Sequence, residues 1–229
     1  MAPGDTIVLD AGVTYTGNFR IPAKTNPNNK WIYLVSSNLA NLPQGQRVLP
    51  AGAVNMPKIV SPNVSQGAFL CGWCESLALC RNRGLFGINV QAEGLPNFYA
   101  YALIDKVTYP SVTLPDSIVF DRVYGHGDAT HDVQRAISAN YSNAALVNSY
   151  ISDIHMAGTE TQAFEAWESP GPFKIVNNYL EAAGENLMFD GAGGPNNKYV
   201  PSDIEVRGNY IFKPQSWVLS ALLPSIKWW

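Results

Sequence analysis

The chain has 229 residues, 46% of them hydrophobic, which is enough to bury the core of one domain or at most two. Charged residues make up only 14%, while glycine (19) and proline (16) are plentiful, so a coiled coil, a disordered tail and a charged helical bundle are excluded. The net charge of −3 and the absence of a long apolar run argue against nucleic acid or a membrane as partners.

Short apolar–x–apolar segments recur along the whole chain, and this alternation is typical of strands with one buried face. The first are Ile7–Leu9, Ile32–Leu34, Lys58–Val60 and Ile88–Val90. Four later segments end on a tyrosine, namely Ile118–Tyr124, Ala144–Tyr150, Phe173–Tyr179 and Ile204–Tyr210.

One apolar residue of each segment, the third position in all but Lys58–Val60, marks a repeat with steps of 25–31 residues. The markers are Leu9, Leu34, Ile59, Val90, Phe120, Leu146, Ile175 and Val206. Each step has room for further short strands, with candidates at Tyr101–Asp105, Ala136–Asn140, Ala163–Trp167 and Asn186–Asp190, and no step contains a useful helical stripe. The pattern predicts an all-β protein, a single-stranded parallel β-helix of about eight coils whose inward residues form apolar ladders.

In such a stack, equivalent residues of successive coils lie above one another. Asn178 and Asn209, aligned with Ser149, are therefore expected to form a corner ladder in which side chains bond turn backbone. The four tyrosines that end the later segments are expected to form a stacked row and not a ligand-binding site; they are Tyr124, Tyr150, Tyr179 and Tyr210.

The beginning of the chain, Pro3-Gly4-Asp5-Thr6-Ile7-Val8-Leu9 followed by Gly12 and Tyr15-Thr16-Gly17, resembles the first-coil motif of the pectin-lyase-like right-handed β-helix superfamily. The segments Phe173–Leu180 and Ile204–Ile211 are similar to its repeating coil. These motifs specify the fold and not the chemistry. Members include pectate and alginate lyases, polygalacturonase-like hydrolases, epimerases, esterases, phage tailspikes and non-catalytic surface proteins.

The resemblance implies a right-handed β-helix. It also implies a protein that acts outside the cytoplasm, secreted or periplasmic, from which any signal peptide has been removed. Family members have a capping helix before the first motif, whereas this chain begins almost on it. We expect a β-helix domain over 1–216 and a non-repeat tail over 217–229, and we treat the chain as a possible piece of a longer β-helix. Open coil ends expose unpaired backbone, so a homo-oligomer joined through them is expected as one possibility.

The segment Gly67–Arg83 lacks strand alternation and contains all three cysteines, Cys71, Cys74 and Cys80. The Cys71–Cys74 spacing suits a metal or redox site, but a zinc site needs four ligands and none completes it. Small apolar thiols in a loop or core are the preferred interpretation, and we expect no bound metal there.

The outward face of the first sheet is a candidate surface for an extended polysaccharide. Lys174 and Glu205 lie on neighbouring layers, where a surface ion pair is expected. The functional alternative is a lyase in which Lys174 or Arg207 removes a proton beside a sugar carboxylate. Such a lyase would use Ca²⁺, although no three-carboxylate cluster is evident in the sequence and no other cofactor is expected.

The loop from His126 to Asp132 is the densest polar cluster, and it leads to Arg135. His126, Asp128 and His131 are candidates for acid–base catalysis near neutral pH, together with Asp121 at the end of the preceding strand. The alternative for Asp128 is a turn stabilised by its side chain.

A second candidate group follows along the chain. If Phe164 packs inward, Glu165 and Trp167 face outward together, as a carboxylate beside a sugar-stacking indole. A register slip of one residue would bury Glu165 instead. The predicted groove combines the Asp121–Arg135 loop with Glu165, Trp167 and Lys174. Carboxylates one or two layers apart would match the spacings of retaining or inverting glycosidases, and Asp121, Glu165 and Asp190 are the candidates, with no pairing among them assigned.

A nucleophilic hydrolase has weaker support, because no Gly-x-Ser-x-Gly elbow occurs. Ser138 or Ser152 with one of the three histidines and Asp153 would be the triad of an esterase. The function that the sequence favours is therefore cleavage of an extended polysaccharide by a hydrolase or lyase. A non-catalytic binding or structural β-helix and an esterase are the alternatives.

Overall fold

The apolar segments of the chain form strands of three parallel sheets that wind around a shared core. The computed structural model describes residues 2–21, 26–62, 68–71, 81–86, 89–91, 99–101, 116–167, 169–189, 200–215 and 217. Within these residues, no helix is long and apolar enough to cross a membrane.

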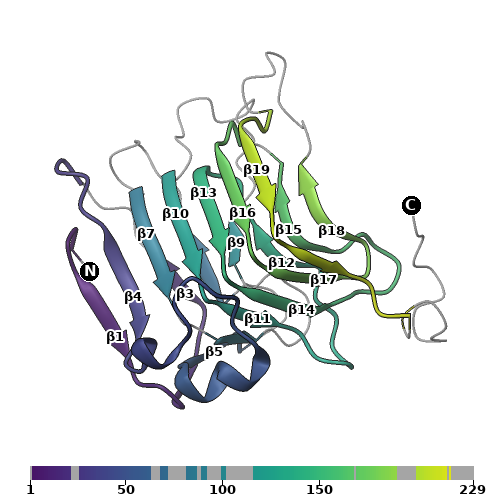
Figure 1. Cartoon of the computed structure of the whole chain (residues 1–229), viewed down its shortest axis with the longest axis horizontal. Helices are drawn as coiled ribbons and strands as arrows, with labels where there is room; N and C mark the ends of the chain where they lie inside the picture. Colours follow the sequence, from purple (N-terminus) through teal and green to yellow (C-terminus); the bar gives the residue numbers. More distant parts are fainter. Residues whose placement is uncertain are drawn as a thin grey trace.

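Successive strands go to sheets A, B and C in turn, so each coil contributes one strand to each sheet (Figure 1). Sheet A consists of β1 (Thr6–Leu9), β4 (Ile32–Ser36), β7 (Arg81–Phe86), β10 (Asp116–Asp121), β13 (Ser142–Val147), β16 (Phe173–Val176) and β19 (Ile204–Arg207). Sheet B consists of β2 (Thr14–Thr16), β5 (Lys58–Val60), β8 (Asn89–Gln91), β11 (Tyr124–His126), β14 (Tyr150–Ile154), β17 (Tyr179–Ala182) and β20 (Tyr210–Phe212). Sheet C consists of β3 (Phe19–Ile21), β6 (Phe69–Cys71), β9 (Tyr99–Tyr101), β12 (Arg135–Ser138), β15 (Gln162–Ala166) and β18 (Glu185–Phe189).

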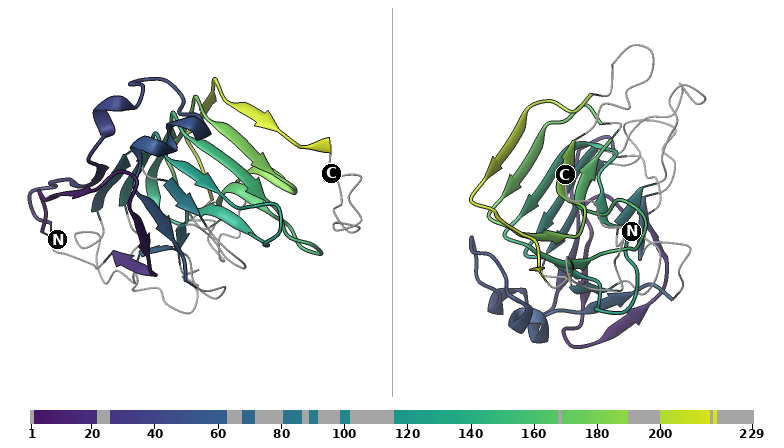
Figure 2. Two further views of the ribbon diagram at one scale, coloured as in Figure 1. Left: turned by 90° about the horizontal axis from the view of Figure 1, so that it is seen from below. Right: turned by 90° about the vertical axis from the view of Figure 1, so that its right-hand side faces the viewer.

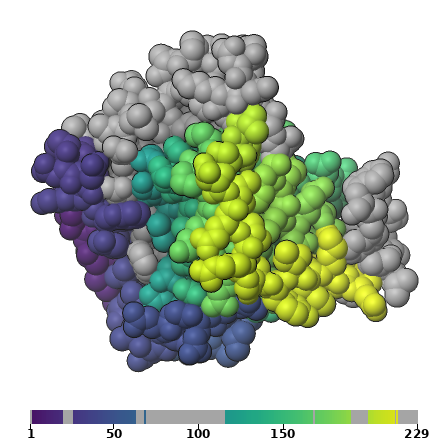
Figure 3. Space-filling view, turned by 45° about the horizontal axis from the view of Figure 1, so that its top comes forward, coloured from purple at the N-terminus to yellow at the C-terminus, as the bar shows by residue number. Residues whose placement is uncertain are grey.

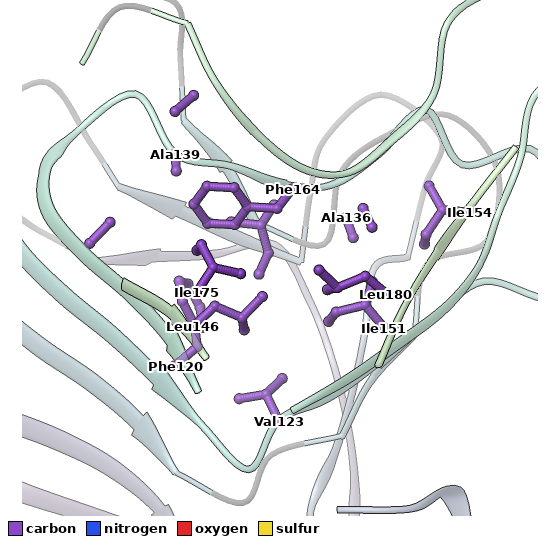
Figure 4. Close-up of a cluster of buried hydrophobic side chains, with 14 of the residues drawn as sticks. Phe120, Val123, Ala136, Ala139, Leu146, Ile151, Ile154, Phe164, Ile175 and Leu180 are labelled. Atoms are coloured by element: carbon purple, nitrogen blue, oxygen red, sulfur yellow. The ribbon is translucent and has the colours of Figure 1, made fainter. Parts of the chain in front are cut away.

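The architecture is a parallel β-solenoid, as predicted, with the first coil at one end of the stack and β19 and β20 at the other (Figure 2). Phe120, Leu146, Ile175 and Val206 lie at one register position of sheet A, where they form the expected apolar ladder. The first three of them are buried and meet residues of sheets B and C such as Leu180 (Figure 4). Burial of this shared core holds the coils together, since no single coil encloses its own apolar face.

Within the described residues, sheets A and B have seven strands each, which differs from the predicted eight coils. Ile59 and Val90 lie side by side on sheet B and not on sheet A, so the repeat assigned to the first half of the chain was wrong. The strand that follows Leu34 on sheet A is β7, in which Leu85 pairs with it, 51 residues later. A long insertion between β4 and β5 causes this gap, and β7 begins with polar residues that hide its alternation.

The extra strands predicted within each step are confirmed as sheet C. The described strands β9, β12, β15 and β18 overlap the four predicted segments and begin one or two residues earlier. Cys71 ends β6, whereas Cys74 and Cys80 lie outside the described residues, as does most of Gly67–Arg83. The tail predicted after residue 216 is also outside them, except for Trp217.

The corner between sheets A and B contains the asparagine ladder that the repeat predicts. Asn178 Oδ1 accepts a hydrogen bond from Ser149 N at 2.9 Å, and Asn209 Oδ1 accepts one from Asn178 N at 2.8 Å. Asn178 Nδ2 donates to Leu146 O at 2.8 Å. These amides satisfy buried turn backbone, so they stabilise the corner.

An insertion between β4 and β5 covers part of this corner. It contains two short helical turns, η1 (Leu39–Asn41) and η2 (Pro50–Asn55), which Figure 1 shows close to β5. Arg47 reaches the last coils, where it donates to Asn177 O at 3.3 Å and to Gly208 O at 2.8 Å. Leu42, Val48 and Met56 of the insertion form a second small core that packs on Tyr124 and Tyr150 of sheet B.

Candidate active site

The predicted site residues are distributed over the outer faces of all three sheets and one loop. Asp121 ends β10 at the A–B corner, where its carboxylate binds the neighbouring Arg122 at 2.9 Å. It also accepts a hydrogen bond from Asn148 Nδ2 at 3.0 Å. Arg122 and Asn148 both have positive φ, 54° in each case. Asp121 therefore stabilises the left-handed residues of two stacked turns.

Lys174 and Arg207 lie on the exposed outer face of sheet A. Their strands place Lys174 beside Glu205, as predicted. Glu205 Oε1 instead lies 2.5 Å from Arg207 Nε on its own strand, and the described ion pairs do not include one with Lys174. The expected pair between neighbouring layers is thus replaced by a pair within one strand, for which an i, i+2 spacing on one face is sufficient.

Asp128 stabilises the turn that connects sheets B and C. Its Oδ1 accepts hydrogen bonds from Thr130 N at 2.7 Å, Thr130 Oγ1 at 2.8 Å and His131 N at 2.9 Å. Its Oδ2 lies 2.7 Å from His131 Nδ1. Partial burial acts to raise the pKa of Asp128, but these hydrogen bonds outweigh it and lower that pKa well below the ordinary value. The carboxylate is therefore committed to the turn, in agreement with the second of the two interpretations above.

His126 is the last residue of β11, on the outer face of sheet B. Its ring stacks on Tyr124 with 4.4 Å between centroids, and Nδ1 lies 2.7 Å from Gly127 O. Burial lowers the pKa of His126, and the nearby charge of Lys58 acts in the same direction. His126 is therefore mostly neutral at pH 7.

Arg135, Glu165 and Trp167 come together at sheet C. Arg135 Nε donates a hydrogen bond to Gln162 Oε1 at 3.0 Å. Glu165 Oε2 lies 2.6 Å from the same nitrogen and forms an ion pair with it, but it accepts no hydrogen bond from that N–H. The guanidinium carbon lies 5.7 Å from the centre of the Trp167 ring. Ser138 Oγ donates to Glu165 Oε1 at 2.6 Å.

The prediction that Glu165 faces outward with Trp167 was wrong, because the side chain of Glu165 is only 1% exposed. Ala163 and Phe164, consecutive residues, both belong to the core, so the strict alternation that the prediction assumed is interrupted here. Burial raises the pKa of Glu165, against the lowering effects of Ser138 and Arg135. Glu165 is enclosed between Ser138 and Arg135, so we treat it as a structural carboxyl.

The tyrosine row is confirmed on the outer face of sheet B. Tyr150 stacks on Tyr179 with 4.1 Å between ring centroids, and Tyr179 on Tyr210 with 5.5 Å. Tyr124 meets Tyr150 edge-on at 5.8 Å. Burial raises the pKa of Tyr124, Tyr150 and Tyr179, so these hydroxyls stay protonated and act as hydrogen-bond donors.

Glu181 shares this face with the tyrosines, and it is 7% exposed. Tyr179 Oη donates a hydrogen bond to Glu181 Oε2 at 2.5 Å, and Asp153 N donates to Glu181 Oε1 at 3.2 Å. Burial raises the pKa of Glu181, the two hydrogen bonds lower it, and the negative charge of Asp153 raises it further. The net direction is upward, which favours a protonated carboxyl closer to neutral pH than usual.

A β-bulge brings a second carboxylate to Glu181. Between Ile151 and Ile154 the pairing of β14 with β17 shifts, so that Ser152 and Asp153 together lie opposite Glu181. Asp153 has a φ of 58°, in the left-handed region. Bulges of this type re-aim side chains and are frequent next to active sites, and left-handed backbone at a non-glycine residue often marks function.

The serine candidates do not form a triad among the described residues. Ser152 Oγ donates to Asp153 Oδ2 at 3.1 Å, and Ser138 is bound to Glu165. His155 is buried and its Nε2 lies 2.7 Å from Asp128 O. Neither serine therefore has a histidine base within hydrogen-bond reach.

Sequence reasoning did not select Glu181, the residue at the centre of this group. A signal was available, because Glu181 follows Tyr179 by two residues and alternation places both side chains on one face. The bulge at Asp153 had no counterpart in the pattern. Among the described residues, no group of three His, Cys, Asp or Glu side chains is suited to a metal ion.

Comparisons with models of protein families, with curated proteins and with solved structures find no significant match to this chain. The class of protein therefore follows from the structure itself, which is a parallel β-solenoid with an aromatic row and a bulge-positioned carboxyl pair on sheet B.

Proposed function

We propose that the protein hydrolyses an extended polysaccharide on the outer face of sheet B, with Glu181 and Asp153 as the catalytic carboxyls. The observation that carries this proposal is the bulge that sets Asp153 against Glu181 on the neighbouring coil. The two residues come from adjacent strands, which are about 4.8 Å apart in a sheet. Retaining glycosidases hold their two carboxyls about 5–5.5 Å apart.

The pKa directions suggest how the roles are divided. Glu181, with its raised pKa, is the acid that protonates the glycosidic oxygen as the bond to the sugar breaks. Asp153 attacks the anomeric carbon and forms a glycosyl ester with the enzyme. Glu181, now ionised, then takes a proton from a water molecule, which attacks the anomeric carbon of the glycosyl ester and releases both the sugar and the carboxylate of Asp153.

The shape of the face favours a polymer. The insertion packs on Tyr124 and Tyr150, whereas the row beyond them passes Glu181 and ends on Tyr210 and Phe212, which are 53% and 36% exposed. Exposed aromatic side chains beside hydrogen-bonding groups suit the apolar faces and hydroxyls of sugars. The resemblance to pectin-lyase-like proteins, several of which act on polysaccharides outside the cytoplasm, supports a secreted or periplasmic enzyme of this kind.

The purified chain tests this proposal against a panel of neutral and acidic polysaccharides, with new reducing ends and product masses as the readout. We expect Glu181→Gln and Asp153→Asn each to lower turnover about 10²–10⁴-fold, the range for a lost acid–base group. Glu160→Gln, an exposed carboxylate of the same coil, is the matched control and should keep full activity.

The retaining mechanism makes two sharper predictions. The first product should keep its anomeric configuration, and azide should restore activity to Asp153→Gly by forming a glycosyl azide. Retention of a polymer in affinity electrophoresis with no product on any substrate would replace the hydrolase with a binding protein. Products with an unsaturated sugar would identify a lyase.

A further inference from the structure

The last described strand of sheet A exposes side chains whose partners in the preceding coil are buried. Val206 pairs with Ile175 and Ile204 with Phe173, at inward-facing register positions. Ile175 and Phe173 are 0% and 1% exposed, whereas Val206 and Ile204 are 45% and 38% exposed. Figure 3 shows the yellow segment that contains β19 and β20 uncovered along its visible face.

The backbone of β19 is equally open on that side. The carbonyl groups of Asp203 and Arg207 accept hydrogen bonds from Phe173 N and Asn177 N of the preceding coil. Since backbone groups alternate in direction along a strand, the N–H and C=O groups of Val206 point away from β16. In the described part of the chain, no strand pairs with this side of β19. An open edge of this kind is a template for another strand.

The charges of β19 are arranged symmetrically about Val206. Glu205 and Arg207 flank it and share the outer face of the sheet. If a second copy pairs antiparallel with Val206 opposite Val206, then Glu205 of each copy lies opposite Arg207 of the other. Opposite charges in directly facing positions stabilise a strand pair, and the arrangement is satisfied twice.

We propose that the protein forms a symmetric dimer through its β19 edges, in antiparallel register centred on Val206. Val206 of each copy then exchanges both backbone hydrogen bonds with Val206 of the other, and the exposed inward side chains meet. A twofold interface of this kind closes on itself.

The alternative self-association is head-to-tail, with β19 of one copy parallel to β1 of the next. That register continues the sheet and places Glu205 beside Thr6 and Arg207 beside Val8, so neither charge finds a partner. Such a contact also repeats without closing and produces filaments. Charge complementarity therefore favours the symmetric pair.

Sedimentation of the full chain, whose mass is 25.0 kDa, tests the dimer. We expect the wild type to associate to twice this mass. Val206→Lys should be monomeric, and so should Glu205→Arg and Arg207→Glu, since each charge reversal creates two like-charge contacts and should weaken association at least a hundredfold. Lys174→Glu changes a charge on the adjacent strand away from the edge, and it should remain a dimer.

A mixture of Glu205→Arg with Arg207→Glu distinguishes this register from any other. Each variant loses its internal ion pair, yet the mixed dimer has opposite charges at both contacts and should recover the dimer mass. A monomeric wild type, a polymer longer than two, or a mixture that stays monomeric would overturn the proposal. Circular dichroism of each variant confirms that the fold is intact, and none of these residues belongs to the proposed active site.

Discussion

Replacing Asn178 by alanine should destabilise the solenoid strongly, because this side chain satisfies backbone that no water reaches. Asn178, Ser149 and Leu146 are all 0% exposed. The substitution removes the acceptor of Ser149 N–H and a donor to Leu146 C=O, together with the contact of Nδ2 with Asn209 Oδ1 at 3.0 Å. A buried N–H without a hydrogen-bond acceptor costs about 1–3 kcal/mol, and each further lost hydrogen bond costs about 1 kcal/mol. We therefore expect the free energy of unfolding to fall by roughly 2–4 kcal/mol.

Urea unfolding followed by circular dichroism measures this loss, and an unchanged slope shows that the unfolding unit is the same. Asn209→Ala is the matched comparison, since it removes the equivalent bonds, from Asn178 N and Nδ2 and to Ile175 O at 2.7 Å, from a half-buried side chain that water can partly replace. Its expected cost is about 1 kcal/mol. Asn178→Ser should recover part of the loss, because Ser149 occupies the same position one coil earlier and its Oγ accepts from Val123 N at 3.0 Å. A cost below that of Asn209→Ala would refute the reasoning.

Three further perturbations test other parts of the structure. Tyr179→Phe removes a hydrogen bond that lowers the pKa of Glu181, so that pKa should rise and the alkaline limb of a pH–activity profile should move to higher pH. Glu165 has a folded pKa raised by burial, so its contribution to stability is complete below the ordinary glutamate pKa and is lost as pH rises through the folded value. Unfolding free energies measured across that window should fall for the wild type and stay flatter for Glu165→Gln. A Cβ on Gly127 would overlap Asp153 O, so Gly127→Ala should displace the bulge and reduce polysaccharide turnover by at least tenfold. Gly52→Ala, whose Cβ meets only the Leu42 side chain at 3.4 Å, is the control and should keep the activity.

The second half of the chain was easier to predict than the first. From Phe120 onward, each coil has 26–31 residues on sheet A and repeats its tyrosine, so register and the asparagine corner could be predicted directly. The insertion after β4 lengthens one coil, and a repeat read by spacing alone then assigned Ile59 and Val90 to the wrong sheet. The number of residues between two segments does not show to which of the three sheets each segment belongs.

In the candidate site, too, some features could be predicted from the sequence and others could not. Asp121 and Asp128 are polar residues at turns, and the structure uses both for turn bonding. Arg135, Glu165 and Trp167 do come together, but the interrupted alternation at Ala163 and Phe164 encloses the carboxylate. Alternation predicts the direction of a side chain only while the strand keeps its pleat.

The sequence by itself determined the solenoid, the inward apolar ladders and the stacked corner residues, because these depend on a period that local composition records. Only the tertiary structure decided that Asp153 and Glu181 meet, since a bulge arises where two neighbouring coils differ by one residue between paired positions. That difference belongs to the pairing of two strands and to neither strand alone, so no periodic pattern within one coil reveals it.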